Sequence, residues 1–138
     1  MIVNINDIKF YGEFYPNNPE HLWYFCLNDY QVYNMEDLIE NYSFKDRNEI
    51  EQSNMYVELF KTNIVDLQKK FIELNNFQNN KKFRTILLEE TEYSVAFGRF
   101  IDYFHYEMWP SWYAFIEEHL INDAIEWCRK NNIPYIVK

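Results

Sequence analysis

The sequence predicts an α+β fold, with a small antiparallel sheet of about three strands followed by a bundle of about four helices. Two observations lead to this fold class. Residues 22–27 and 55–60 are short apolar runs rich in aromatic side chains, a composition typical of strands. The second half of the chain instead repeats its apolar residues every three or four positions, which is the spacing of a helix that buries one face.

The 138 residues fit one domain, and we expect a single domain over residues 1–138. A hydrophobic fraction of 48% can fill its core without a disulfide or a metal ion. Cys26 and Cys128 have apolar neighbours and are predicted to be buried, reduced thiols. The first residues lack a leader pattern, and no apolar run is long enough to span a membrane. We therefore expect a cytoplasmic protein that contacts no membrane.

The N-terminal element is open to two interpretations. Asn6 and Asp7 can cap a short helix over residues 8–11 that ends at Gly12, although the apolar side chains nearby also fit a strand. Residues 16–19 combine prolines with asparagines, which is typical of a turn, and His21 is expected in the same loop.

The strands follow this loop. Residues 22–27 and a returning strand over 31–35 predict a β-hairpin. One helical turn is expected over 36–42, and the polar residues 43–53 are expected to form a surface loop. Residues 55–60 alternate between two faces and predict the third strand.

Four helices are expected in the second half of the chain. Their predicted N-caps, each with a side-chain oxygen, are Thr62 or Asn63, Asn79 or Asn80, Thr91, and Ser111. Pro110 disfavours a helical Trp109, so the third helix is expected to end near Met108. Gly98 lies inside that helix and predicts close packing against a neighbouring element.

The last two helices are expected to pack through one aromatic cluster that extends from Phe97 to Trp127. The buried face of the third helix should hold Tyr93, Phe97, Phe100, Ile101 and Phe104. The buried face of the last helix should hold Trp112, Phe115, Ile116, Leu120, Ala124 and Trp127. Asn131 and Asn132 can end the last helix in a left-handed conformation, with Ile133 making the accompanying apolar contact.

The charge balance bears on partners. The chain carries 22 acidic residues against 13 lysines and arginines, a net charge of −9 at pH 7. Direct binding of nucleic acid requires a basic surface and is not expected. An acidic surface favours solubility, and it also suits docking on another protein with a basic surface. We therefore expect a basic protein partner, and neither nucleic acid nor a membrane.

No pattern in the sequence completes a catalytic or metal site. His119 and Asp123 lie four residues apart on one helix face and are candidate metal ligands, but two ligands do not form a site. His105 would need a neighbouring nucleophile, and Cys128 lacks an accompanying Cys–His–Asn pattern. With two glycines in the chain, a glycine-built phosphate loop is not expected. We expect no metal and no cofactor, and we favour a binding protein over an enzyme.

The candidate binding residues lie around the proline break. They are Arg99, Asp102, His105 and Tyr113. Arg99 and Asp102, three apart on a helix, can pair with each other, or either can bond to the last helix. A structural ion pair is the favoured interpretation, and binding of an anion by Arg99 is the alternative.

The same stretch resembles a known family. An aromatic–Arg–Phe–x–Asp helix, a proline break and a Trp-Tyr-x-Phe helix are formed by Phe97, Arg99, Phe100, Asp102, Pro110, Trp112, Tyr113 and Phe115, with Ala124 and Trp127 further along. This pattern is similar to the C-terminal signature of the bacterial uncharacterised protein family 0158, and the hairpin and third strand also fit. The resemblance covers residues 5–133, but residues 28–30 lack the glycine that the family usually carries in its hairpin turn. It implies a shared fold and no known activity, cofactor or catalytic residue.

These observations predict a non-enzymatic protein-interaction or regulatory module. The alternative is a small enzyme or ligand-binding protein with a pocket near Arg99, His105 and Tyr113. A deep cleft with convergent polar groups would favour the alternative, and a flat acidic face would favour the interaction module.

Overall fold

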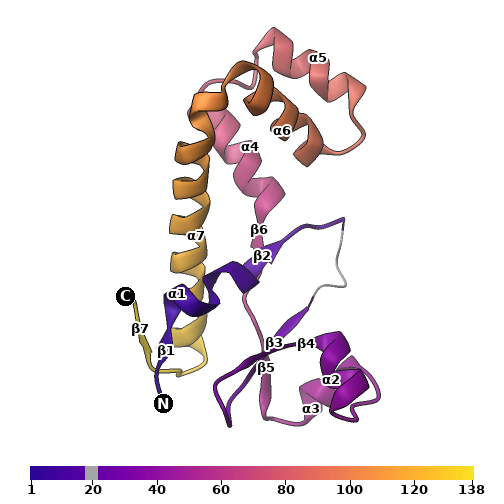
Figure 1. Ribbon diagram of the computed structural model, residues 1–138, viewed down its shortest axis with the longest axis vertical. Helices are drawn as coiled ribbons and strands as arrows, with labels where there is room; N and C mark the ends of the chain where they lie inside the picture. The colour runs from indigo at the N-terminus through magenta and orange to yellow at the C-terminus, as the bar shows by residue number, and fades with distance from the viewer. Residues whose placement is uncertain (18–21) are drawn as a thin grey trace. The chain divides into compact units, whose positions relative to one another are not determined.

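The computed structural model describes residues 1–17 and 22–138 and shows a mixed fold of helices and short strands (Figure 1). A small antiparallel three-stranded sheet is present, as the sequence predicts. The predicted bundle of four helices is not confirmed, because the described residues form seven α-helices. The chain forms two compact units: unit 1 comprises Met1–Thr62 and His119–Lys138, and unit 2 comprises Asn63–Glu118. A single domain over residues 1–138 stays a prediction.

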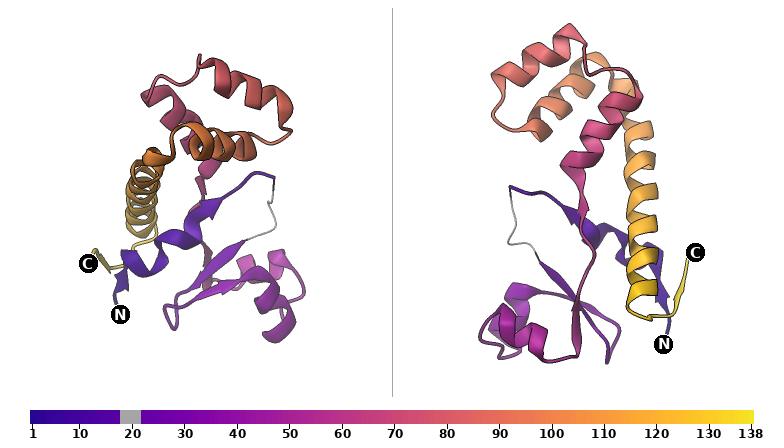
Figure 2. Two further views of the ribbon diagram at one scale, coloured as in Figure 1. Left: turned by 45° about the horizontal axis from the view of Figure 1, so that its top comes forward. Right: turned by 180° about the vertical axis from the view of Figure 1, so that it is seen from behind.

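The three-stranded sheet lies in unit 1 and has the strand order β4-β3-β5. Figure 2 shows the ribbon of these strands from two further sides. The central strand β3 (Trp23–Cys26) pairs in antiparallel with β4 (Val32–Asn34) and with β5 (Tyr56–Glu58). Successive side chains of β3 point to opposite faces, so Tyr24 and Phe25 belong to two different buried clusters. The predicted hairpin and third strand are therefore confirmed.

The hairpin turn forms without glycine. Tyr30 takes the left-handed conformation that glycine usually supplies, with φ of 56°. Its backbone N–H donates to the Cys26 carbonyl oxygen at 2.9 Å, and its ring meets the Phe25 ring edge-on at 5.0 Å. The Tyr33 hydroxyl donates to the Asp29 carboxylate, and this bond lowers the pKa of Asp29. These contacts offset the strain of a non-glycine residue at this position.

Two short helices cover one face of the sheet. The first, α2 (Met35–Asn41), is close to the expected helical turn, but the loop expected over residues 43–53 is wrong. There the chain forms α3 (Arg47–Gln52), because the Asp46 side chain caps it by accepting from the Glu49 backbone N–H at 3.0 Å. Ile50 anchors α3: it is fully buried and belongs to one cluster with Leu22, Tyr24 and Leu38.

The N-terminal element is a helix, and this helix begins earlier in the chain than expected. After β1 (Val3–Asn4), α1 (Ile5–Ile8) starts at Asn4, whose side chain accepts from the Asn6 backbone N–H at 3.2 Å. A 3-10 helix, η1 (Lys9–Gly12), follows directly. The cap lies upstream of the predicted Asn6 and Asp7, so Ile5 and Ile8 share the buried face.

Two further pairs of strands are too short to predict. β1 runs parallel to β7 (Tyr135–Ile136), and β2 (Glu13–Phe14) pairs with β6 (Thr62–Asn63). Strands of two residues show no alternation of apolar and polar side chains. Residues 18–21, which include His21 and part of the predicted turn, lie outside the described residues.

Residues from both ends of the chain build the core of unit 1. Trp127 packs edge-on against Phe25 with ring centres 5.4 Å apart, and its indole N–H donates to the Glu58 carbonyl oxygen at 2.9 Å. The buried members of this core are Val3, Ile5, Ile8, Phe25, Leu59, Ala124, Trp127, Cys128 and Ile133. Cys26 and Cys128 are both buried and free, as predicted.

Unit 2 is helical. Its elements are α4 (Ile64–Leu74), α5 (Lys81–Glu89), α6 (Tyr93–Phe104), the 3-10 helix η2 (Tyr106–Met108), and the first turns of α7 (Trp109–Lys130). Asn63 caps α4 and Asn80 caps α5, so both predicted starts are confirmed. The start predicted at Thr91 is wrong by one residue, because Glu92 occupies the N-cap of α6 without a side-chain bond.

Three aromatic rings form the centre of unit 2. Phe71 lies 6.2 Å from Phe97 and 5.4 Å from Trp112, and Phe97 lies 4.8 Å from Trp112, all measured between ring centres. Phe104 is 41% exposed and does not belong to this core, contrary to expectation. The single cluster predicted from Phe97 to Trp127 is therefore divided, since Trp127 packs within unit 1.

The break before α7 differs from the prediction. Trp109 is helical, with φ of −54° and ψ of −46°, and Pro110 stands in the first turn of α7, where its missing N–H leaves no bond unmade. The expected cap at Ser111 is therefore wrong. The predicted end is confirmed, since Asn132 has φ of 57° and the Ile133 N–H donates to the Cys128 carbonyl oxygen at 2.9 Å.

The two glycines have opposite surroundings. A Cβ atom at Gly12 would overlap the Phe60 ring, so this position admits no side chain without rearrangement. A Cβ atom at Gly98 would have no atom within 4 Å among the described residues. The close packing expected at Gly98 is therefore wrong.

Candidate functional site

An open hollow of about 500 Å³ lies where α6, η2 and α7 follow one another in unit 2. We call it the Trp109 hollow. It is lined by Asp102, Tyr106, Glu107, Trp109, Pro110 and Tyr113. Tyr106 is 70% exposed and Tyr113 is 60% exposed, so both phenol rings are accessible to a ligand.

Trp109 is held in place from several sides. Its indole N–H donates to Asp102 Oδ1 at 2.8 Å, which joins α6 to the first residue of α7. Its ring stacks on Tyr113, one helical turn further along, with centres 5.8 Å apart and planes 21° apart. Phe97 meets the Trp109 ring nearly edge-on at 6.3 Å. The indole is thus fixed before any ligand arrives.

The electrostatic character of the Trp109 hollow is negative. Asp102 and Glu107 line it, and no lysine or arginine is among the residues that do. Asp102 uses one oxygen for the indole N–H of Trp109. Glu107 faces His105 Nδ1 at 3.5 Å, a contact that carries charge only when the histidine is protonated. Carboxylate oxygens beside aromatic faces form a site suited to a cation.

Arg99 has other partners than the expected Asp102. Its Nη1 lies 2.7 Å from Glu90 Oε1 and 3.1 Å from Glu89 Oε2. The hydrogen bond to Glu90, assisted by Glu89, raises the pKa of the Arg99 guanidinium. Arg99 therefore forms an ion pair with residues other than the expected Asp102, and Asp102 takes the alternative bond to the last helix.

A second hollow, of about 330 Å³, lies between α5 and α6, and we call it the Lys81 hollow. It is lined by Lys81, Lys82, Thr85, Ile86, Glu89, Arg99, Tyr103 and Phe104. Lys82 Nζ lies 4.5 Å from the centre of the Phe104 ring. This hollow carries three cationic side chains against one carboxylate, so its charge is opposite to that of the Trp109 hollow.

The structure places the four sequence-predicted binding residues in three settings. Asp102 and Tyr113 line the Trp109 hollow, and Arg99 lines the Lys81 hollow. His105 follows the end of α6, where its ring stacks on Phe77 with centres 4.4 Å apart. The three residues of the alternative pocket, Arg99, His105 and Tyr113, therefore do not line either hollow together.

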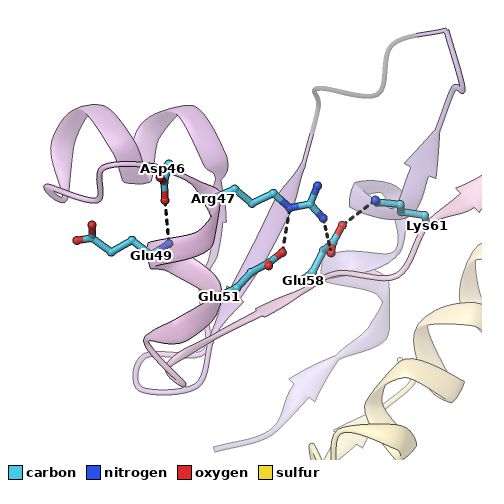
Figure 3. A network of polar contacts seen from close by, with 6 residues as sticks. All are labelled: Asp46, Arg47, Glu49, Glu51, Glu58 and Lys61. Carbon is cyan, nitrogen blue, oxygen red and sulfur yellow. Dashed lines mark hydrogen bonds and ion pairs between the residues drawn. The ribbon is translucent and has the colours of Figure 1, made fainter.

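A network of polar contacts in unit 1 has a structural role (Figure 3). Arg47 on α3 bonds Glu51 at 2.9 Å and Glu58 on β5 at 3.1 Å, and Lys61 lies 2.7 Å from the Glu58 carboxylate. Figure 3 shows Arg47 between Glu51 and Glu58, and Glu58 between Arg47 and Lys61. The network fastens α3 to the edge strand of the sheet.

The candidate metal ligands lie in unit 1. Asp123 accepts a hydrogen bond from the Thr62 hydroxyl at 2.6 Å, and His119 is one turn earlier on α7. Over residues 1–17 and 22–138, no group of three or more His, Cys, Asp or Glu side chains is arranged to hold a metal ion. Burial raises the pKa of the Cys128 thiol to about 11, which keeps it protonated at neutral pH.

Sequence reasoning missed Trp109 and Tyr106 as site residues. A signal was present, because Tyr103, Tyr106 and Tyr113 all fall off the apolar faces predicted for their helices. Large aromatic side chains that no buried face requires are candidates for exposed binding surface. The decisive feature, a helical Trp109 bonded to Asp102, depends on the three-dimensional course of the chain at Pro110.

Comparisons of this chain with protein-family models, with curated proteins and with solved structures find no match. The resemblance to family 0158 therefore stays a prediction. In the part of the chain that the structure describes, no helix combines the length and the apolar character needed to cross a membrane.

Proposed function

We propose that this protein is a non-enzymatic interaction module whose Trp109 hollow binds a basic segment of a partner protein. One observation carries the proposal: exposed aromatic rings and two carboxylates line this hollow without a lysine or arginine among them. Accessible tyrosine and tryptophan rings beside polar groups are typical of protein-binding surfaces.

The chemistry of the lining supports a cationic ligand. A lysine or arginine over an exposed tryptophan or tyrosine face gains about 0.5–1 kcal/mol, and two nearby carboxylates add an electrostatic attraction. The net charge of −9 also raises the rate at which a basic partner meets the protein. Among the residues that line the hollow, no nucleophile stands beside a base, which favours binding over catalysis.

Binding of a short labelled peptide, in which serines alternate with lysine and arginine, tests the proposal. Fluorescence anisotropy should show binding that weakens as ionic strength rises, because exposed charges are screened within about 8 Å at physiological salt. The same peptide with glutamate in place of each basic residue should not bind.

A charge-neutral variant then locates the site. Asp102→Asn combined with Glu107→Gln should weaken peptide binding about tenfold, while the asparagine oxygen can still accept from the Trp109 indole. The matched control is Glu40→Gln with Glu118→Gln, which removes two exposed carboxylates outside the hollow. The proposal is overturned if the parent protein does not bind the basic peptide, or if both double variants lose affinity equally.

A further inference from the structure

The Trp109 hollow presents a flat aromatic platform, which is the outer face of the stacked Trp109–Tyr113 pair. The Trp109 and Tyr113 rings lie nearly parallel, 21° apart, and Tyr113 exposes 60% of its surface. The bond from the indole N–H to Asp102 and the edge contact with Phe97 fix the orientation of this ring pair. A planar cation can therefore stack on the platform without first ordering it.

Carboxylate acceptors stand beside the platform on different elements. Asp102 comes from α6 and Glu107 from η2, and both line the same hollow as the ring pair. Asp102 Oδ1 accepts from the indole N–H, and the Asp102 side chain is exposed to solvent. The site thus combines a flat apolar surface with hydrogen-bond acceptors at its edge.

Arginine and lysine use such a site differently. The guanidinium of arginine is planar, stacks on aromatic rings and has five donors in a fixed plane, so it can stack and bond carboxylates at once. The ammonium of lysine is a compact, strongly hydrated charge that does not stack. A flat platform edged by carboxylates therefore distinguishes the two side chains.

We infer that the Trp109 hollow takes an arginine side chain of the basic partner in preference to lysine. This inference rests on the proposed function, because it names which basic residue anchors the partner. The stacked Trp109–Tyr113 pair provides the preference, and the carboxylates of Asp102 and Glu107 provide the attraction for either cation.

Titration with N-acetyl-arginine amide, N-acetyl-lysine amide and N-acetyl-citrulline amide tests the inference by NMR. The indole N–H signal of Trp109, assigned by its loss in Trp109→Phe, reports binding in the hollow. Arginine amide should bind about threefold to fivefold more tightly than lysine amide, in keeping with the value of a stacked guanidinium at an exposed site. Citrulline amide has nearly the same shape without the charge, and it should bind most weakly.

A ring-removing variant separates stacking from charge. Tyr113→Leu keeps an apolar side chain but removes the exposed ring of the stack, so the preference for arginine should fall to about twofold or less, and lysine binding should weaken by less than arginine binding. Tyr103→Leu is the matched control, because Tyr103 is 70% exposed on α6 but lies outside the Trp109 hollow. This control should keep the full preference.

The outcomes distinguish the inference from the proposed function. Equal affinity for arginine and lysine amides, together with binding of the basic peptide, overturns the arginine preference and leaves the proposed function standing. Failure of the peptide and of both cationic amides to shift the Trp109 signal overturns both. Equal binding of citrulline amide also overturns both, because recognition would then not depend on charge.

Discussion

The two units of this protein differ in how far apart along the chain their core residues lie. In unit 1, the end of α7 and β7 pack with β1, α1 and the sheet, so Trp127 meets Phe25. In unit 2, the central rings of Phe71, Phe97 and Trp112 come from one consecutive segment. Contacts between distant residues require closure of long loops, so unit 1 has the larger entropic barrier to folding. The separation of the core residues along the chain therefore distinguishes the two units.

The largest expected effect tests the core of unit 2. Trp112 is 4% exposed, and Trp112→Ala should lower the free energy of unfolding by about 3–5 kcal/mol, the range for large aromatic deletions. Urea unfolding measures the loss. Amide hydrogen exchange should show that protection falls more in α4 and α6 than in the three-stranded sheet.

The control for this variant is Glu118→Ala, an exposed residue on the same helix, which should change stability by no more than about 0.5 kcal/mol. A Trp112→Ala protein within about 1 kcal/mol of the parent would show that the Phe71–Phe97–Trp112 cluster is not the core of unit 2. If amide protection fell equally in both units, the Phe71–Phe97–Trp112 cluster would not stabilise unit 2 separately from unit 1.

The next effect tests unit 1 at the point where Gly12 packs closely against the Phe60 ring. Gly12→Ala places a Cβ atom against the Phe60 ring, and the overpacking should destabilise the protein by about 1–3 kcal/mol in urea unfolding. When Phe60 is already replaced by alanine, Gly12→Ala should lower the free energy of unfolding by less than it does in the parent protein. Strictly additive losses would contradict the direct clash.

A smaller effect concerns α3, the helix that the sequence did not predict. Asp46→Ala removes the side-chain acceptor of the Glu49 N–H and should cost about 1 kcal/mol. Asp46→Asn retains the acceptor and should stay close to the parent, because aspartate and asparagine cap equally well. Thermal unfolding of both variants measures the difference, and equal melting temperatures would exclude the cap as the cause.

The smallest effect has the opposite sign and lies in unit 2. Gly98→Ala replaces glycine inside α6 at a position with free space, so it should stabilise the protein by up to about 1 kcal/mol. The midpoint of urea unfolding should rise. A lower midpoint would contradict the free space around Gly98.

The sequence predicted the elements that have an apolar period, together with some of their ends. The hairpin at Phe25, the helix capped by Asn63 and the stop at Asn132 all followed from local residue types. The helix α3 was missed because a single buried residue, Ile50, gives no period. The pairing of β1 with β7 was missed because two residues show no alternation.

The candidate site was predictable in part. Asp102 and Tyr113 were named from the sequence, and both line the Trp109 hollow. Trp109 was missed because the steric effect of Pro110 argued against a helical residue there. The indole bond to Asp102 and the stack on Tyr113 stabilise that conformation, and they involve residues on two helices. A rule that considers only residues adjacent in the sequence cannot take such tertiary contacts into account.

The division of unit 1 by an inserted segment has a consequence during synthesis on the ribosome. The strands and helices of Met1–Thr62 are made before Trp127, Cys128 and Ile133, which belong to the same core as Phe25 and Ile5. At about 5–20 residues per second, translation of Asn63–Glu118 takes roughly 3–11 s. For at least that time the nascent chain exposes the apolar face of its sheet, because the residues of α7 that pack against it are not yet made. The newly made N-terminal part is therefore the segment that most needs chaperone protection against aggregation.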